Sequence, residues 1–391
     1  MTEAVIVDAV RTPGGKRNGK LKDWHPAALA AHVLNALVER NHLDPALVDD
    51  VIMGCVSQVG QQALNVGRNA VLTAGWPESV PSTTVDRQCG SSQQAMHFAA
   101  QGVIAGAYDI VVAAGVESMT NTPMGSSVVK FTLGSPFPQE MVDRYEATGL
   151  PPQGIGADMI AVEYGISRED LDAFGAQSQQ RAEQATAEGR FDNELIPVPY
   201  DLDGTKEMLT ADEGIRPGTT AEGLAKLKPA FKEDGLITAG NSSQISDGAS
   251  AVLIMSAEKA KELGLKARAR FHAFAVVGTD PVTMLKGPIP ATKKILEKTG
   301  MSIDDIDLFE VNEAFASVVL AWAKETGADM SKVNVNGGAI ALGHPLGCSG
   351  TKLMATLLNE LERTGGRFGM QVMCEGGGLA NATIIERIVE G

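Results

Sequence analysis

Two cysteines and one histidine lie in settings that suit nucleophilic chemistry. Cys89 follows a β-branched segment, residues 82–85, and precedes apolar residues at helical spacing from Met96 to Ala107. The chain is therefore expected to turn into a helix at Cys89. Unpaired N–H groups and the positive end of the helix dipole favour a thiolate at such a position. Cys89 is a candidate nucleophile, and the alternative is a buried structural cysteine.

His344 lies in a glycine-rich loop between Gly343 and Pro345, ahead of a helix expected over residues 349–364 with Ser349 as its N-cap. The proline favours an extended backbone at His344, which suits an imidazole that must point in one direction. The glycine spacing is similar to that of a phosphate-binding loop, but His344 and Pro345 replace the Lys and Ser/Thr that this motif needs. His344 is either a catalytic base or a structural histidine.

Cys374 ends an apolar strand and is followed by Glu375 and three glycines, residues 376–378. Consecutive glycines let N–H groups converge on an oxyanion. Asn312, at the end of another strand, either caps the next helix or holds a water in a site. The cysteines and His344 lack the paired Cys-x-x-Cys spacing of a zinc site. Two thiols and an imidazole instead suit covalent acyl chemistry, in which one thiolate attacks a carbonyl and the second moves a proton.

The composition is that of a globular protein of 391 residues with a net charge of −15. This charge argues against nucleic acid or an anionic membrane as the main partner. Four cysteines in so long a chain do not form a disulfide framework, and the N-terminus resembles no signal peptide. We therefore expect a protein of the reducing cytoplasm.

Apolar runs that alternate with helical periodicity predict an α/β layered sheet. Strand 109–115 and the segment 367–376 share a strand-then-glycine pattern that suggests a duplicated core. Strands are expected over residues 4–9, 51–56, 82–85, 110–115, 249–255, 269–278, 306–311, 369–374 and 382–388. The first of these should end in a turn-rich basic surface loop, residues 11–15. Helices are expected over residues 26–39, 65–74, 257–264, 290–298 and 349–364, with others after Cys89 and after Phe315.

Between residues 119 and 241 the sequence is rich in Pro, Gly, Gln and charge and has few apolar strand runs. Ser167 followed by Asp170 is a capping-box signal for a helix within this stretch. We expect a lid-like insertion on the main body, because long loops of this kind are usually functional.

At this point the motifs resemble those of the thiolases, in unbroken order along the whole chain. They are the Cys89 turn, Asn312-Glu313-Ala314-Phe315, Gly337 to Pro345, and Cys374 with its glycines. The resemblance implies a five-layer α/β/α/β/α fold of two similar halves. It divides the chain into an N-terminal half (residues 1–118 with 242–262), a loop domain for coenzyme A, lid and oligomerisation (119–241), and a C-terminal half (263–391).

The resemblance also implies roles for individual residues. Cys89 would attack the 3-keto carbon and become acylated, while His344 takes its proton. Cys374 would protonate the departing acetyl-CoA carbanion and then deprotonate the incoming CoA thiol. One oxyanion site would be His344 with a water held by Asn312, and the other the backbone N–H groups of Cys89 and Gly376.

Coenzyme A is implied as a co-substrate, with no permanently bound cofactor and no metal. The residues that carry over to CoA and acyl binding are Arg216, Ser243, Met284 and Phe315. Acyl-CoA and CoA are then the small-molecule partners, and the resemblance implies a homodimer or homotetramer.

Details of the sequence favour a degradative 3-ketoacyl-CoA thiolase. The His-Met pair of biosynthetic acetoacetyl-CoA thiolases is replaced by about Pro152-Gln153, and Arg87-Gln88-Cys89 is closer to degradative members. The Cys374-Glu375 ending resembles actinobacterial members, some of which act on sterol-derived acyl chains. Alternatives are a biosynthetic thiolase, a decarboxylating condensing enzyme, which would have His or Asn in place of Cys374, and a non-catalytic acyl-CoA-binding subunit. Cys348 is expected to pack beside the site.

Overall fold

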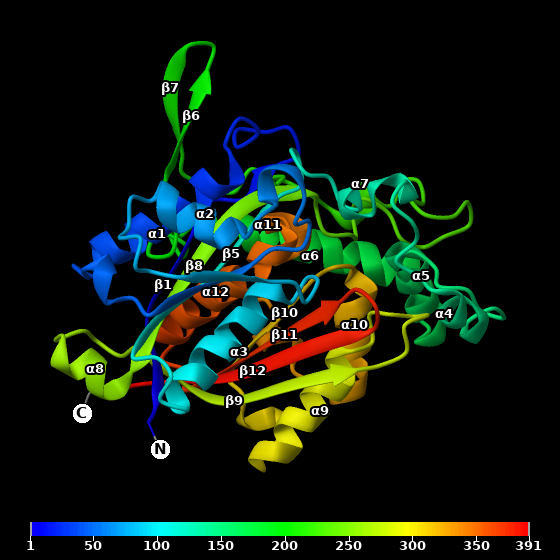
Figure 1. The fold of residues 1–391 in the computed structure, drawn as a ribbon. Coiled ribbons are helices and arrows are strands. Elements are labelled where there is room, and N and C mark those ends of the chain that lie inside the picture. The colour runs from blue at the N-terminus through cyan, green and yellow to red at the C-terminus, as the bar shows by residue number, and fades with distance from the viewer. Residues whose placement is uncertain (1, 390–391) are drawn as a thin grey trace.

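The computed structural model describes residues 2–389, and its centre is a ten-stranded sheet (Figure 1). The strand order is β10-β11-β12-β9-β1-β8-β5-β3-β4, with β2 paired to β8 beside this path. Its strands are β1 (Ala4–Arg11), β2 (Gly15–Lys16), β3 (Asp50–Gly54), β4 (Ser82–Val85), β5 (Ile110–Ser118), β8 (Ser246–Ser256), β9 (Ala269–Gly278), β10 (Leu308–Val311), β11 (Phe368–Glu375) and β12 (Leu379–Arg387). Each strand that was predicted from an apolar run is present.

The helices are α1 (Pro26–Arg40), α2 (Val66–Thr73), α3 (Ser91–Ile104), α4 (Gln139–Arg144), α5 (Gln153–Glu163), α6 (Arg168–Ala187), α7 (Ala221–Leu224), α8 (Ala257–Glu262), α9 (Pro288–Thr299), α10 (Ala316–Thr326), α11 (Ala339–Leu342) and α12 (Ser349–Thr364). Each predicted helix is present, together with four that were not predicted (α4, α5, α7 and α11). Gly365, with φ 75°, ends α12 as a left-handed C-cap.

The two halves of the sheet repeat one arrangement. In the N-terminal half, β5 is parallel to β3 and antiparallel to β8. In the C-terminal half, β11 is parallel to β10 and antiparallel to β12. β5 and β11 are the two segments whose shared pattern suggested duplication, and that inference is confirmed. Two residue pairs between β1 and β9, Val5 with Arg270 and Ile6 with Ala269, join the halves.

The five-layer arrangement is confirmed by how the helices cover this sheet. α1 and α2 pack on the outer face of the N-terminal half, and α9 and α10 pack on that of the C-terminal half. α3 and α12 contact each other and strands from both halves, so they form the central layer (Figure 1). Their N-termini approach so closely that a Cβ on Gly350 would overlap with the backbone of Gln93.

The stretch between β5 and β8 contains α4 to α7 and an exposed two-stranded hairpin, β6 (Val198–Leu202) with β7 (Thr205–Leu209), which projects from the body in Figure 1. The predicted capping box is present, since Ser167 and Asp170 bond each other's backbone N–H groups at the start of α6. Buried residues of α5 and α6 join the core beneath α10. α5 and α6 thus anchor their part of the insertion to the C-terminal half, while Ile196, Val198 and Leu209 join the core of the N-terminal half.

Two local expectations are wrong. Ser349 is the first residue of α12 and not its N-cap, because a 3-10 turn over Leu346–Cys348 runs directly into the helix and places Cys348 at the cap. Arg11, expected in a basic loop, is the last residue of β1 and is fully buried, because Glu194 and Asp212 of the insertion neutralise its charge.

Candidate active site

Cys89 lies on the turn between β4 and α3. Gln88 before it has a left-handed backbone, φ 48°, which is uncommon for a residue with a side chain and typical of a tight functional turn. Ser91 closes the turn, since its Oγ accepts from the Arg87 N–H at 2.9 Å and donates to the Gln88 carbonyl at 2.5 Å. The strand-to-helix transition predicted around Cys89 is confirmed.

The side chain of Cys89 is buried in a small apolar cluster. Its partners are Met119, Leu346, Leu353 and Met373. Leu346 follows His344 by two residues, and Met373 immediately precedes Cys374. The structure therefore brings the three stretches with candidate catalytic residues together, although they are far apart in the sequence.

His344 is buried and held through Ser349. The two atoms His344 Nδ1 and Ser349 Oγ are 2.5 Å apart, and Ser349 Oγ donates to the Pro345 carbonyl at 2.9 Å. Because the serine hydrogen is used in that bond, Oγ accepts from an Nδ1–H group. We assign this tautomer from the hydrogen bonds; it leaves Nε2 without a hydrogen and able to accept a proton.

Asn312 lies between His344 and Cys374. Its Nδ2 is 3.5 Å from His344 Nε2 and 3.9 Å from Cys374 Sγ. The N-cap of α10 is Phe315, so Asn312 does not cap that helix. Of the two interpretations of Asn312, the structure supports the one that places it in the site.

Gly376 lies just beyond β11, close to the Cys89 turn. A Cβ on Gly376 would be 3.0 Å from Gln88 Oε1 and 3.3 Å from Gln153 Nε2, at the start of α5. Gly377 and Gly378 have φ of 80° and 77°, a backbone that strongly favours glycine. Gln153 therefore lies beside Gly376.

The electrostatics differ from the sequence-based expectation for Cys89. Burial raises the pKa of the Cys89 thiol well above its ordinary value, and Cys374 and Glu375 act in the same direction. Desolvation therefore outweighs the helix dipole, and the expectation of a resting thiolate is wrong. Burial also raises the pKa of Cys374 to about 12. Burial, aided by the charge of Lys352, lowers the pKa of His344 to about 3.

The resting site consequently contains neutral thiols and a neutral imidazole. A neutral imidazole whose Nε2 carries no hydrogen is able to accept a proton, and a thiol is a proton donor. Proton transfer to His344 is then linked to attack on a substrate, when donors can stabilise the new oxyanion.

The residues expected at CoA occupy three places. Ser243 is half-buried and donates its N–H to the Ala314 carbonyl at 2.9 Å, next to Phe315, whose ring packs edge-on against Phe231 at 5.8 Å. Arg216 is exposed, with its N–H bonded to Gln179 Oε1 on α6 at 2.8 Å. Met284 is half-buried with a left-handed φ of 63°.

The other two cysteines are both buried. Cys55 is fully buried in the core beneath α1 and α2. Cys348 is buried, with its Sγ 3.1 Å from Ser250 Oγ. Residues 2–389 contain no group of three or more His, Cys, Asp or Glu side chains arranged to hold a metal ion.

Sequence reasoning missed that Ser349 and Lys352 hold His344 in place. They belong to a polar series on α12 at helical spacing, Ser349, Lys352, Thr356 and Asn359, all of them buried. Such spacing normally indicates a solvent-facing stripe. The position of this series directly after the His344 loop was the sequence signal that could have linked it to the site.

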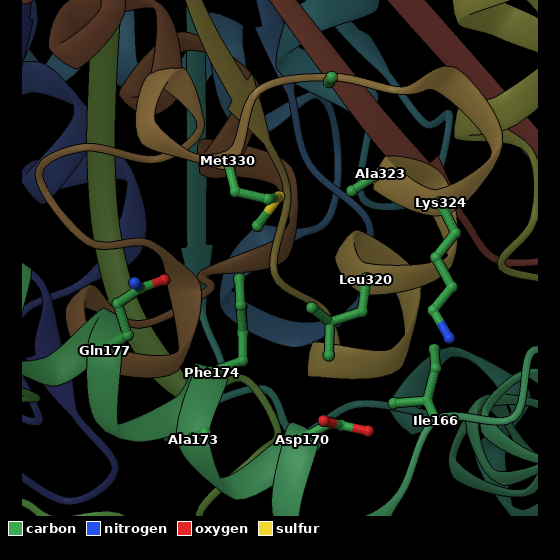
Figure 2. A pocket seen from close by; sticks show the side chains of 10 residues that line it. Ile166, Asp170, Ala173, Phe174, Gln177, Leu320, Ala323, Lys324 and Met330 are labelled. Carbon is green, nitrogen blue, oxygen red and sulfur yellow. The ribbon is translucent and has the colours of Figure 1, made fainter.

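A separate surface hollow of about 550 Å³ lies between α6 and α10 (Figure 2). Phe174, Leu320 and Met330 line it, and its lining includes none of the candidate catalytic residues. Among the described helices, none is both long and apolar enough to cross a membrane.

The fold and the site define an α/β enzyme of covalent thiol chemistry, in which an imidazole and a second thiol share one amide neighbour beside the nucleophile. The thiolase N-terminal domain family matches residues 4–258, and the thiolase C-terminal domain family matches residues 265–387. The chain belongs to the thiolase family.

Relatives match over nearly the full length. The steroid 3-ketoacyl-CoA thiolase FadA6 of Mycobacterium tuberculosis is 50% identical, over 99% of this chain and 95% of its own. A 3-ketoacyl-CoA thiolase of Aliivibrio fischeri is 47% identical, over 99% and 100%. The crystal structure of the Bacillus anthracis acetyl-CoA acetyltransferase superposes with a TM-score of 0.90 at 39% identity, covering 99% of both chains.

Proposed function

We propose that this protein is a 3-ketoacyl-CoA thiolase. It cleaves 3-ketoacyl-CoA with CoA to give acetyl-CoA and a shortened acyl-CoA. The observation that carries this proposal is Asn312, which lies within reach of both His344 Nε2 and Cys374 Sγ, while Cys374 lies near enough to Cys89 to raise the pKa of its thiol. The names of the relatives, 3-ketoacyl-CoA thiolase in several bacteria, support the same reaction.

In the first half-reaction, Cys89 Sγ attacks the 3-keto carbon and its proton passes to His344 Nε2. The bond between C2 and C3 then breaks. Cys374 gives its proton to the acetyl-CoA carbanion, which leaves as acetyl-CoA, and the acyl group stays on Cys89. In the second half-reaction, the Cys374 thiolate takes the proton of CoA, whose sulfur attacks the acyl carbon. Cys89 leaves and recovers its proton from His344.

Each step develops negative charge on an oxygen, and preorganised donors lower such a barrier by several kcal/mol. We assign one oxyanion site to His344 with a water held by Asn312. We assign the other to the backbone N–H groups of Cys89 and Gly376. The N–H groups of Cys89 and Gly376 lie at turns. The adjacent residues, Gln88 and Gly377, have a left-handed backbone, which gives the chain an unusual direction there.

For CoA binding we propose Ser243, Arg216, Met284 and Phe315, with the insertion 119–241 as the CoA-binding domain. The two catalytic halves are then residues 1–118 with 242–262, and residues 263–391; the outermost residues 1, 390 and 391 lie outside the described residues. Ser243 supports this assignment because its backbone is bonded to the segment that carries Asn312 and Phe315.

The degradative direction is proposed over the biosynthetic one, in which two acetyl-CoA molecules condense. Gln153 at the site and the similarity to a steroid 3-ketoacyl-CoA thiolase favour longer acyl chains. The similarity to an acetyl-CoA acetyltransferase is the observation in favour of the alternative. Thiolysis rates for acetoacetyl-CoA, for a straight-chain C8 substrate and for a sterol side-chain 3-ketoacyl-CoA decide between them. A strong preference for acetoacetyl-CoA would contradict the degradative assignment.

The catalytic assignment itself is tested by mass spectrometry of the protein after incubation with 3-ketoacyl-CoA in the absence of free CoA. We expect an acyl group on Cys89. An unmodified Cys89, together with no thiolysis, would favour a non-catalytic acyl-CoA-binding subunit.

We further propose a homodimer or homotetramer in the reducing cytoplasm. β4 is an edge strand of the sheet, and Phe98 on the neighbouring α3 is 44% exposed, which suits an interface between copies. All four cysteines are free thiols, as a reducing compartment allows. Light scattering after size-exclusion chromatography measures the assembly.

A further inference from the structure

Lys352 is a buried lysine one turn into α12, and it is bound to the loop that carries His344. Its side chain is only 4% exposed. Its Nζ donates to the carbonyls of Leu342 and Gly343 at 2.6 and 2.9 Å. These are the two residues immediately before His344. Charged donors make shorter and stronger hydrogen bonds than neutral ones, so this anchor is a firm one.

The His344 segment is therefore held by one helix on both sides of the imidazole. Lys352 fixes the backbone that enters His344, and Ser349, one turn earlier on α12, fixes the ring through Nδ1. Gly343 has a φ of 81°, so the chain changes direction at the residue whose carbonyl accepts from Lys352 Nζ. The orientation of Nε2 then depends on both contacts.

The charges around Lys352 do not compete for its ammonium group. Asp212 and Glu194 face it from the insertion, but both are paired with Arg11 of β1 at 2.8 and 2.6 Å. Cys348 faces it from the turn before α12, and the buried Glu310 faces it from β10. Within the described residues, Lys352 makes no ion pair, so its donors serve the loop carbonyls.

A small enclosed cavity connects Lys352 with the rest of the site. Its volume of about 10 Å³ is close to the space of one water molecule. Lys352, Ser349, Gly343 and Asn312 all line it. Lys352, the loop that carries His344 and the Asn312 amide are thus neighbours around one cavity.

We propose that Lys352 is a positioning residue for the thiolase reaction, which acts by anchoring the carbonyls of Leu342 and Gly343 so that His344 Nε2 faces the reacting thiol. It acts through His344 and touches no substrate. The expected effect of Lys352 on catalysis rests on the proposed function. Its effect on the orientation of the His344 imidazole does not depend on turnover.

The test uses the full-length protein labelled with ¹⁵N-histidine, with the His344 signals assigned by their loss in His344→Asn. At pH 7.5 the wild type should show one protonated and one bare ring nitrogen, the signature of a fixed tautomer. Lys352→Met should average these two signals. Lys352→Arg, which retains a charged donor, should restore the wild-type pattern. Lys332→Met removes a lysine that also bonds a carbonyl, that of Ile306 at 3.0 Å, and should change nothing.

Turnover provides the second measurement. Lys352→Met should lower kcat roughly ten- to a hundredfold with little change in KM, since a misplaced catalytic group costs about this much. If the methionine variant does not fold, Lys352→Gln, which keeps a neutral donor, should show the same changes partially. A wild-type tautomer pattern with wild-type kcat in either variant would overturn the proposal. A wild type without thiolysis would refute the proposed function, while the ¹⁵N signals would still test the anchor.

Discussion

The Cα of Gly90 packs directly against the carboxyl group of Glu375, so that a Cβ at position 90 would overlap with Oε1. Gly90 follows Cys89 in the sequence, and Glu375 follows Cys374. Both carboxyl oxygens of Glu375 are buried without a hydrogen-bond partner in the described residues. Burial raises the pKa of Glu375 to about 8, although Arg87 opposes the shift.

Glu375→Gln should stabilise the protein at neutral and alkaline pH. The folded protein keeps the proton to about pH 8, whereas the unfolded chain releases it near pH 4.3. Stability is therefore lost as the pH rises through this window, by about 4 kcal/mol at pH 7, and glutamine removes that loss. Urea unfolding should show a small gain at pH 5 and a large gain at pH 8. Glu297→Gln, an exposed carboxyl on α9, is the control; equal gains at both pH values for Glu375→Gln would contradict the prediction.

Gly90→Ala should destabilise the protein by about 1–3 kcal/mol, the usual cost of overpacking. The φ of Gly90 is −86°, which alanine adopts readily, so the effect is steric. The double variant with Glu375→Ala should recover part of this loss, measured as an interaction energy in a double-mutant cycle of urea unfolding. Gly223→Ala, whose Cβ would meet only Thr220 Oγ1 at 3.5 Å, is the matched control. Strictly additive effects at positions 90 and 375 would disprove the contact.

Cys374→Ser should separate the two proton-transfer roles. It should still transfer an acyl group to Cys89 from a reactive acyl-CoA, because Cys89 and His344 are intact. It should lose carbon–carbon cleavage by several orders of magnitude, since a serine hydroxyl is a far weaker acid than a thiol. Cys89→Ala should lose both steps. Mass spectrometry and thiolysis rates measure them, and an equal loss of both in Cys374→Ser would refute the shuttle role.

Ser349→Ala should lower kcat at least tenfold with KM nearly unchanged, because the Nδ1–H group loses its acceptor and the tautomer is no longer fixed. Ser302→Ala removes an exposed cap serine of a short 3-10 helix and should leave kcat as it is. An increase in KM without a change in kcat would instead place Ser349 in substrate binding.

Much of the site could be predicted because its signals are local. Cys89, His344 and Cys374 each lie where a strand or loop with a regular apolar pattern meets glycine, and such boundaries are visible in a single sequence. Asn312 at the end of β10 was found for the same reason. The capping box at Ser167 predicted α6 equally well.

The parts that failed depend on distant contacts. Arg11 looked like a surface residue because its partners, Glu194 and Asp212, lie about two hundred residues away. The polar series on α12 has the spacing of a solvent-facing stripe, but it is buried because the central layer has no outer side. The pKa of Cys89 is raised by burial among segments of both halves, and this effect outweighs that of the helix that begins beside it.

The pairing of β1 with β9 and the contact between α3 and α12 have a consequence for what one repeat could do alone. In the proposed mechanism the nucleophile belongs to one repeat, and its proton acceptor and the second thiol belong to the other. A single repeat would carry a thiol without a base, or a base without a nucleophile. The proposed reaction therefore needs both repeats, held together at the seam that β1, β9, α3 and α12 form.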